Sequence, residues 1–204
     1  RPLWTKRVVR LGTVQAPVTA MMVGQSPLAH AGLASELARA DVDLIEVNGS
    51  CPHVTCGGLS CGARADSVYE AAAAVKESCG DMPFMIKLTP QSSDVVEVAL
   101  AAERAGATAV SLINTIPAMA VDLERRRPKL ANRIGGLSGP AIKPVALRQV
   151  WECVKALRIP VVGIGGIFTV RDTLESIRDG ATAVEEGTAT VIDHTALPNI
   201  NTGN

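Results

Sequence analysis

Short apolar runs that alternate with longer helical patterns constrain the fold of this chain more than any other feature of its sequence. Each run is bounded by Gly, Pro, Asn or Ser, as expected of buried strands. The runs lie at Val18–Val23, Leu44–Val47, Phe84–Leu88, Ala109–Ile113, Val161–Ile164 and Ala181–Glu185. The spacing of apolar residues between them predicts helices at Leu28–Ala40, Ser67–Ser78, Asp94–Ala105, Ile142–Leu157 and Val170–Arg178. The sequence therefore predicts six β/α units in an α/β fold.

Glycine-rich turns favour a barrel over an open sheet, although repeated β/α units are compatible with both. Gly163–Gly166 and Gly187–Thr188 follow the last two predicted strands, where (β/α)8 TIM barrels commonly build a phosphate site. Six units are two fewer than a complete barrel, and the chain begins at Arg1 without an initiator Met. We therefore expect one domain over residues 1–204, a fragment of a TIM barrel without its first two units. Residues 190–204 are polar and are expected to form an irregular tail.

The composition restricts the partners and the compartment. Lys+Arg and Asp+Glu both total 20, so no net field attracts nucleic acid or anionic lipid. No apolar run approaches the roughly 18 residues needed to span a bilayer. The five cysteines are odd in number and lack the dense spacing of small secreted domains, which favours a reducing compartment. We expect a cytoplasmic protein that binds small molecules or other proteins, but neither nucleic acid nor membrane.

A cysteine in a glycine-rich segment is the strongest local sign of chemistry. In Glu46–His53 a predicted strand ends in polar residues and is followed directly by Cys51. Gly57, Gly58 and Gly62 extend the segment into a long loop, of a kind that can close over a substrate and exclude water. A thiol there could act as a base, whereas most single cysteines are small buried apolar residues.

A zinc site is an alternative explanation of the same segment. Cys51, His53, Cys56 and Cys61 are suitable ligand types, but their spacing matches no common structural zinc pattern. We therefore expect no metal. Cys79 and Cys153 fall near the end of one predicted helix and within another, and are expected to be packing residues.

Polar residues at the ends of two other predicted strands are candidate binding groups. Lys87 ends an apolar strand, where a charge is costly unless a partner compensates it; the alternative is a lysine that extends to solvent. Asn114 and Thr115 follow the next apolar strand. Their amide and hydroxyl groups could bind the imide edges of a heterocycle, or simply form an Asx-type turn.

Three glycine-rich turns together predict a phosphate site. Gly135–Pro140 precedes the predicted helix Ile142–Leu157, so backbone amides and a helix N-terminus are expected to converge there. Gly165–Gly166 and Gly187–Thr188 add two further turns at successive strand ends. The three turns indicate a phosphorylated cofactor or substrate, and by themselves also permit a phosphate-binding barrel lyase.

The chain resembles the class 1 dihydroorotate dehydrogenases, especially the NAD-linked 1B branch, from about Leu44 to Ala189. The resemblance is carried by motifs whose order and spacing agree with that family, of which the string at Gly135–Pro144 is the most specific. These motifs are Asn48–His53, Lys87–Pro90, Ile113–Thr115, Arg127–Asn132, Gly135–Pro144, Gly163–Ile167 and Gly187–Ala189.

The resemblance implies a role for each matching residue. Cys51 would remove the C5 proton of dihydroorotate while hydride passes from C6 to FMN. Asn48, Asn114 and Thr115 would hold the pyrimidine. Asn48 would also lie near the flavin, Lys87 would stabilise its reduced form, and Ile113 would contact FMN through its backbone. Contacts to the ribityl phosphate would come from Gly139, Gly165, Gly166, Gly187 and Thr188.

The resemblance also implies partners. In the 1B branch, reduced FMN passes electrons to a subunit that carries FAD and an iron–sulfur cluster and then reduces NAD. We expect such an electron-transfer subunit and a homodimer of catalytic chains, acting in pyrimidine biosynthesis.

Several residues depart from the family pattern or leave alternatives open. His53 stands where many class 1 enzymes have Asn and is shared with dihydropyrimidine dehydrogenases, so uracil or thymine is an alternative substrate. Met21 occupies a position expected to face the flavin. Glu185 and Glu186 are acids where the family has mostly Gln or Ala followed by Val, and Glu186 would oppose a phosphate. A non-catalytic, degenerate barrel is therefore a second alternative.

Overall fold

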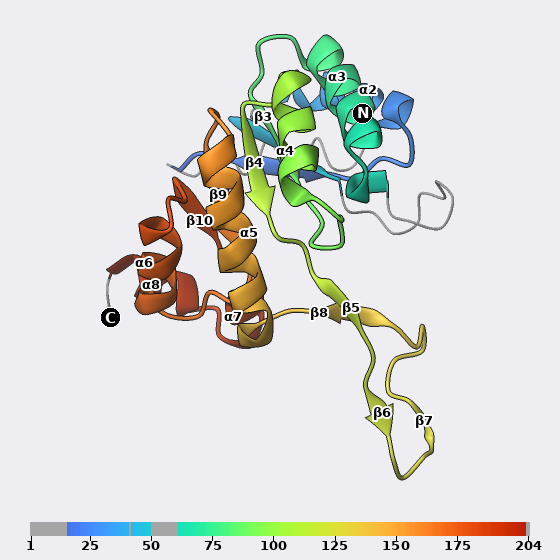
Figure 1. Ribbon diagram of the computed structural model, residues 1–204, viewed down its shortest axis with the longest axis vertical. Helices are drawn as coiled ribbons and strands as arrows, with labels where there is room; N and C mark the ends of the chain where they lie inside the picture. Colours follow the sequence, from blue (N-terminus) through green and yellow to red (C-terminus); the bar gives the residue numbers. More distant parts are fainter. Residues whose placement is uncertain (1–15, 41, 50–60, 203–204) are drawn as a thin grey trace.

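A six-stranded parallel sheet forms the centre of the computed structural model, which describes residues 16–40, 42–49 and 61–202 (Figure 1). Its strand order is β1-β2-β3-β4-β9-β10. The strands are β1 (Thr19–Met22), β2 (Leu44–Asn48), β3 (Phe84–Lys87), β4 (Ala109–Leu112), β9 (Val161–Ile164) and β10 (Ala183–Glu185). All six predicted strands form, and each lies beside the next one along the chain. The sheet confirms the α/β prediction and matches six consecutive units of a TIM barrel.

Helices connect successive strands, as the sequence predicted. They are α2 (Pro27–Leu37), α3 (Ala65–Cys79), α4 (Val95–Arg104), α5 (Lys143–Ala156) and α6 (Val170–Arg178), with short 3-10 turns η1 (Cys61–Ala63) and η2 (Pro140–Ile142). Side-chain caps fix several helix starts. Asp94 accepts hydrogen bonds from the backbone of Val96 and Glu97, and Thr169 and Asp172 form a capping box at the start of α6.

The two faces of the sheet differ in chemistry. The outer face packs against the helices and carries apolar side chains, among them Ile45, Phe84 and Val110, which are fully buried in the main core cluster. Because side chains alternate along a strand, the intervening residues point to the opposite, inner face. That inner face carries a polar set consisting of Glu46, Lys87, Ser111 and Glu185, joined by the contacts described below.

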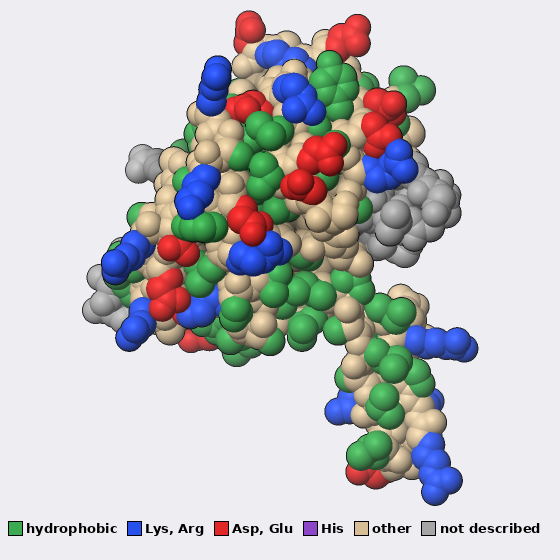
Figure 2. All heavy atoms as spheres, in the orientation of Figure 1, with side chains coloured by type: hydrophobic (Ala, Val, Ile, Leu, Met, Phe, Trp, Pro, Cys, Tyr) green, Lys and Arg blue, Asp and Glu red, His purple; other side chains and the backbone are tan. Residues whose placement is uncertain are grey.

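A long arm projects from the body between β4 and α5 (Figures 1 and 2). It consists of two antiparallel pairs, β5 (Ile116–Ala118) with β8 (Gly135–Leu137) and β6 (Val121–Asp122) with β7 (Arg127–Pro128). The sequence did not predict these strands, because two- or three-residue strands are too short to show an alternating apolar pattern.

The predicted irregular tail is wrong for most of its length. Helix α7 spans Thr188–Ile192 and helix α8 spans Ala196–Thr202. Pro198 falls in the first turn of α8, where a missing backbone N–H removes no helical hydrogen bond, so it does not exclude a helix there. Within the described ranges, no helix has the length and apolar character required to cross a bilayer.

Candidate active site

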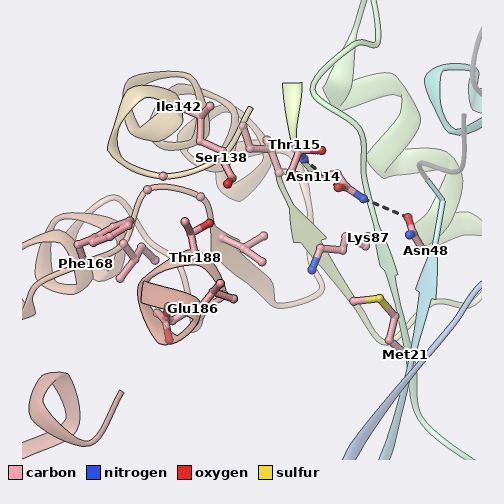
Figure 3. Close-up of a pocket in the computed structure, with 18 residues that line it drawn as sticks. Met21, Asn48, Lys87, Asn114, Thr115, Ser138, Ile142, Phe168, Glu186 and Thr188 are labelled. Carbon is pink, nitrogen blue, oxygen red and sulfur yellow. Dashed lines mark hydrogen bonds between the residues drawn. The ribbon is translucent and has the colours of Figure 1, made fainter. Parts of the chain in front are cut away.

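A cavity of about 420 Å³ lies at the carboxyl ends of the strands (Figure 3). This is the edge at which α/β barrels and sheets build their sites, and the volume falls within the usual range of small-molecule pockets. The residues that line it include every site residue predicted from the sequence except Cys51: Asn48, Lys87, Ile113, Asn114, Thr115, Gly139, Gly165, Gly166, Gly187 and Thr188. Cys51 lies outside the described residues, as do His53 and Cys56.

Apolar lining residues are the part of the pocket that the sequence analysis missed. Ile142, Ile164, Ile167, Phe168 and Val191 contribute to its walls. Their local sequence is typical of ordinary core or helix residues. Only their position next to the glycine turns could have identified them as pocket residues. Met21 at the end of β1 also lines the pocket and is 53% exposed, as the sequence placed it.

Two asparagines form the polar wall beneath the arm. The Asn114 side chain donates a hydrogen bond from Nδ2 to Oδ1 of Asn48 at 3.1 Å, as shown in Figure 3. Oδ1 of Asn114 accepts from the Thr115 backbone N at 2.8 Å, which is the Asx-type contact considered above. The turn and the pocket wall are therefore compatible, because the same bond that forms the turn orients the amide toward Asn48.

Glycines let the backbone approach the opposite end of the pocket. Gly165 and Gly166 have φ values of +126° and +74°, a region that side chains disfavour. A Cβ atom on Gly166 would lie only 2.6 Å from Cβ of Lys143. A Cβ on Gly187 would meet nothing within 4 Å, so this backbone faces open space. The glycine turns thus form a cradle lined by main chain.

The charged residues that line the pocket are Lys87 on β3 and Glu186, which directly precedes Gly187 of the cradle. The nearby Lys143 is paired with Asp172 at 2.6 Å and Glu175 at 2.9 Å, and these bonds raise the pKa of its ammonium. The Glu186 carboxylate accepts a hydrogen bond from the Thr190 backbone at 2.6 Å and another from the Thr190 hydroxyl. An anion in the cradle would depend on backbone N–H groups and Thr188.

Lys87 is buried at the inner face and has the partners that its position requires. Its Nζ donates to Oε2 of Glu185 at 2.9 Å and lies 3.6 Å from Oε1 of Glu46. Glu46 also accepts a 2.6 Å hydrogen bond from the Ser111 hydroxyl. Burial and the neighbouring Glu185 charge raise the pKa of Glu46 to about 6. The ammonium of Lys87 is thus held by two carboxyl groups, a partnership that its sequence position did not identify.

The two cysteines assigned to packing are buried and free. Burial raises the pKa of the Cys153 thiol to about 12 and also raises that of Cys79, so neither is a reactive thiolate near neutral pH.

Comparisons with known proteins identify the family of this chain. The family model described as dihydroorotate dehydrogenase matches residues 6–203. The catalytic subunit of dihydroorotate dehydrogenase B (NAD(+)) from Trichlorobacter lovleyi is 48% identical over 199 residues, which are 97% of this chain and 65% of that protein. The same subunit from Caldicellulosiruptor saccharolyticus is 50% identical over 164 residues, or 79% of this chain and 54% of that protein.

A solved structure shares the fold. The crystal structure of DHODH from Eimeria tenella in complex with ferulenol superposes with a TM-score of 0.67 at 20% identity, covering 86% of this chain and 53% of that one. This chain therefore spans between half and two thirds of the length of these proteins. The match over nearly its whole length, together with the six-stranded sheet and the pocket, shows that the chain belongs to the dihydroorotate dehydrogenase family.

Proposed function

We propose that this chain is the catalytic part of an NAD-linked dihydroorotate dehydrogenase that binds FMN in the pocket and oxidises dihydroorotate to orotate. One observation carries the proposal: a single cavity brings together an asparagine pair, a buried lysine and a glycine cradle from widely separated parts of the chain. The curated relatives named above are catalytic subunits of dihydroorotate dehydrogenase B.

The residues present fit FMN at both ends of the cavity. A Cβ on Gly166 would collide with Lys143, so this backbone needs glycine, and Gly139 has a positive φ of +83°. Together with Gly165, Gly187 and Thr188, these groups would hold the phosphate through backbone N–H groups and one hydroxyl. The apolar walls would hold the ring system, with Lys87 and the Ile113 backbone beside it. When bound, FMN would accept the hydride that leaves the substrate.

The protein would bind and orient the substrate and move one proton. The Asn48–Asn114 pair and Thr115 offer amide and hydroxyl groups suited to the imide edges of a pyrimidine. We assign Cys51 as the base that takes the C5 proton, although it lies outside the described residues. A loop that excluded water over this thiol would let it act near neutral pH.

The relatives' description as catalytic subunits supports a partner. We propose that electrons leave through a subunit carrying FAD and an iron–sulfur cluster, that catalytic chains form a homodimer, and that the enzyme acts in the cytoplasm in pyrimidine biosynthesis. The free thiols of Cys79 and Cys153 are consistent with a reducing compartment.

Flavin bleaching tests the reaction. The purified chain is loaded with FMN, and its flavin absorbance is followed without oxygen. Oxidised FMN is mixed with dihydroorotate. In a second assay, FMN that has first been reduced chemically is mixed with uracil or thymine. We expect bleaching by dihydroorotate and no reoxidation by uracil or thymine. Cys51→Ser should slow bleaching at pH 7 by at least tenfold, whereas Cys56→Ser should not. Equal rates in both variants would contradict the base assignment, and reoxidation by uracil would favour a dihydropyrimidine dehydrogenase.

Glu186 favours one competing function, a barrel that does not bind flavin. Its carboxylate lines the phosphate end of the pocket, and like charges oppose each other there. Titration of the flavin-free chain with FMN, followed by flavin fluorescence, tests this. Failure of both the parent chain and Glu186→Gln to bind FMN would contradict the proposed function.

A further inference from the structure

The inner face of the sheet holds a charge cluster that the proposed reaction leaves unexplained. This inner-face cluster consists of Glu46 on β2, Lys87 on β3 and Glu185 on β10. The side chains of Glu46 and Lys87 are 3% and 7% exposed, and that of Glu185 is 25% exposed. Lys87 lines the pocket, but neither carboxyl group does. The two acids therefore face the lysine from behind the pocket wall.

The charges of this cluster do not balance when every group is ionised. Two carboxylates and one ammonium leave one net negative charge in a buried setting, which is costly. The hydrogen bonds show which carboxylate oxygen has no partner. Lys87 satisfies Oε2 of Glu185, while Oε1 of Glu185 is buried and has no hydrogen-bond partner in the part of the chain that the structure describes.

A shared proton would satisfy that oxygen. The carboxyl groups of Glu46 and Glu185 converge on the Lys87 ammonium, at 3.6 Å and 2.9 Å, and a hydrogen bond between them would satisfy Oε1 of Glu185. Two carboxylates in contact cannot form that bond, because neither has a donor, whereas one protonated carboxyl can donate to the other. The Ser111 hydroxyl fixes Glu46 from the β4 side, so the geometry of the pair is set by three strands.

We propose that Glu46 and Glu185 share one exchangeable proton beside Lys87, and that Glu185 thereby sets the net charge that the pocket wall presents to a bound ring. With the proton the cluster is neutral, and without it the cluster carries one negative charge. Glu185 is a positioning residue, because it acts through Lys87 and does not line the pocket.

The other strands of the parallel sheet add no titratable side chain to this cluster. In the six strands of the parallel sheet, the charged side chains are Glu46, Lys87 and Glu185; β1, β4 and β9 contribute none, and Ser111 is the polar group on β4. The raised pKa of Glu46 agrees with a proton held there, since burial and the Glu185 charge both favour the protonated acid. The neighbouring Glu186 instead bonds to Thr190.

The inference about the pocket rests on the proposed function, because it concerns a flavin beside Lys87. Negative charge gained by a ring in the pocket would be opposed by the ionised cluster and accepted more readily by the neutral one. Binding of a proton from solvent by the cluster would accompany that gain. The flavin of this chain should therefore be easier to reduce at acid than at alkaline pH by more than its own protonation explains.

The first arm of the test uses the chain without flavin. Carboxyl groups of 13C-labelled glutamate are titrated by NMR in the parent chain, in Glu185→Gln and in Glu46→Gln. We expect one glutamate to titrate near pH 6 in the parent chain and none to do so in either variant. Glu124→Gln, an exposed acid at the far end of the arm, is the matched control and should retain that transition. Persistence of the transition in Glu185→Gln would overturn the shared proton.

The second arm measures the FMN midpoint potential at pH 5 and pH 8. At pH 8 the parent cluster is negative and the Glu185→Gln cluster is neutral, so the variant should favour reduced flavin by about tenfold, or about 30 mV for a two-electron couple. At pH 5 both clusters are neutral and the potentials should coincide. A shift equal at both pH values, or absent at pH 8, would overturn control of the pocket by Glu185.

The two arms separate this inference from the proposed function. If neither variant nor parent binds FMN, the proposed function fails, and the carboxyl titration still decides whether the proton is shared. If FMN binds and bleaches but the titration is unchanged in Glu185→Gln, only the further inference fails.

Discussion

The outer and inner faces of one sheet show two ways to bury side chains. On the outer face, alternate residues are apolar and share one core cluster with residues of α2 to α5. The inner face also carries apolar residues such as Met85 and Val162, but among them lies a charged and polar set whose members bond to one another across β2, β3, β4 and β10. The first face should respond to lost volume and be insensitive to pH, whereas the second should respond to lost charge and to pH.

The largest expected effect is loss of volume from the outer face. Phe84 is fully buried in the core, so Phe84→Ala should lower the free energy of unfolding by about 4 kcal/mol. The loss should be the same at pH 5 and pH 8 in denaturant unfolding. Leu174→Ala, at a side chain that is 61% exposed, is the control and should cost less than about 0.5 kcal/mol. Similar losses in both variants would show that the outer face is not the core.

Removal of the Lys87 ammonium from the inner face should cause the second-largest loss in the free energy of unfolding. Lys87→Met leaves two carboxyl groups without their ammonium and should cost roughly 3 kcal/mol at pH 8, which is above the pKa of Glu46. At pH 5 the loss should be smaller, because Glu46 takes up a proton. Thermal unfolding at the two pH values measures the difference, with Lys129→Met on the exposed arm as control. A loss independent of pH would mean that the inner face behaves like the outer one.

The pH dependence of the unfolding free energy measures the contribution of Glu46 to stability. Its pKa is raised from 4.5 to about 6 in the folded chain, so its stabilising contribution is fully present below pH 4.5 and is lost as pH rises through 6. At 1.36 kcal/mol per pKa unit, this contribution amounts to about 2 kcal/mol. The difference in unfolding free energy between the parent chain and Glu46→Gln, measured from pH 4 to pH 8, cancels the other acids. If the parent chain's advantage in unfolding free energy over Glu46→Gln stayed constant or rose with pH, the pKa of Glu46 would not be raised by folding.

The smallest expected effect comes from Ser111. Ser111→Ala removes the hydroxyl that donates to Glu46 and should cost about 1 kcal/mol. Because this hydrogen bond lowers the pKa of Glu46, its loss should move the Glu46 transition to higher pH. Ser93→Ala at an exposed position should do neither. An unchanged transition in the Ser111 variant would remove β4 from the cluster.

The sequence predicted the outer face better than the inner one for a physical reason. Apolar periodicity is local, and it correctly placed all six strands and the five connecting helices. Glycine positions likewise predicted the cradle, because the need for glycine is imposed by the local backbone at Gly165 and Gly166. The partners of Lys87 depend on strand order, since Glu185 lies 98 residues away along the chain.

The sequence also failed to predict the strands of the arm and helix α8. The strands of the arm pair through very short antiparallel segments whose sequence carries too few positions to show a period. Helix α8 forms although its segment is polar and contains Pro198, because a proline in the first turn leaves the helical hydrogen bonds intact. In both cases the composition of the segment gives too weak a local signal to predict the element.

The arm has a mechanical consequence for the pocket. Its two ends, at Thr115 and Ser138, are both pocket walls, and they lie so close that a Cβ atom on Gly136 would come within 2.3 Å of the Thr115 hydroxyl. The arm is therefore joined to the binding site at both of its ends. A displacement of the arm, whose outer part is visible in Figure 2, would be transmitted first to Thr115 and Ser138 in the pocket wall.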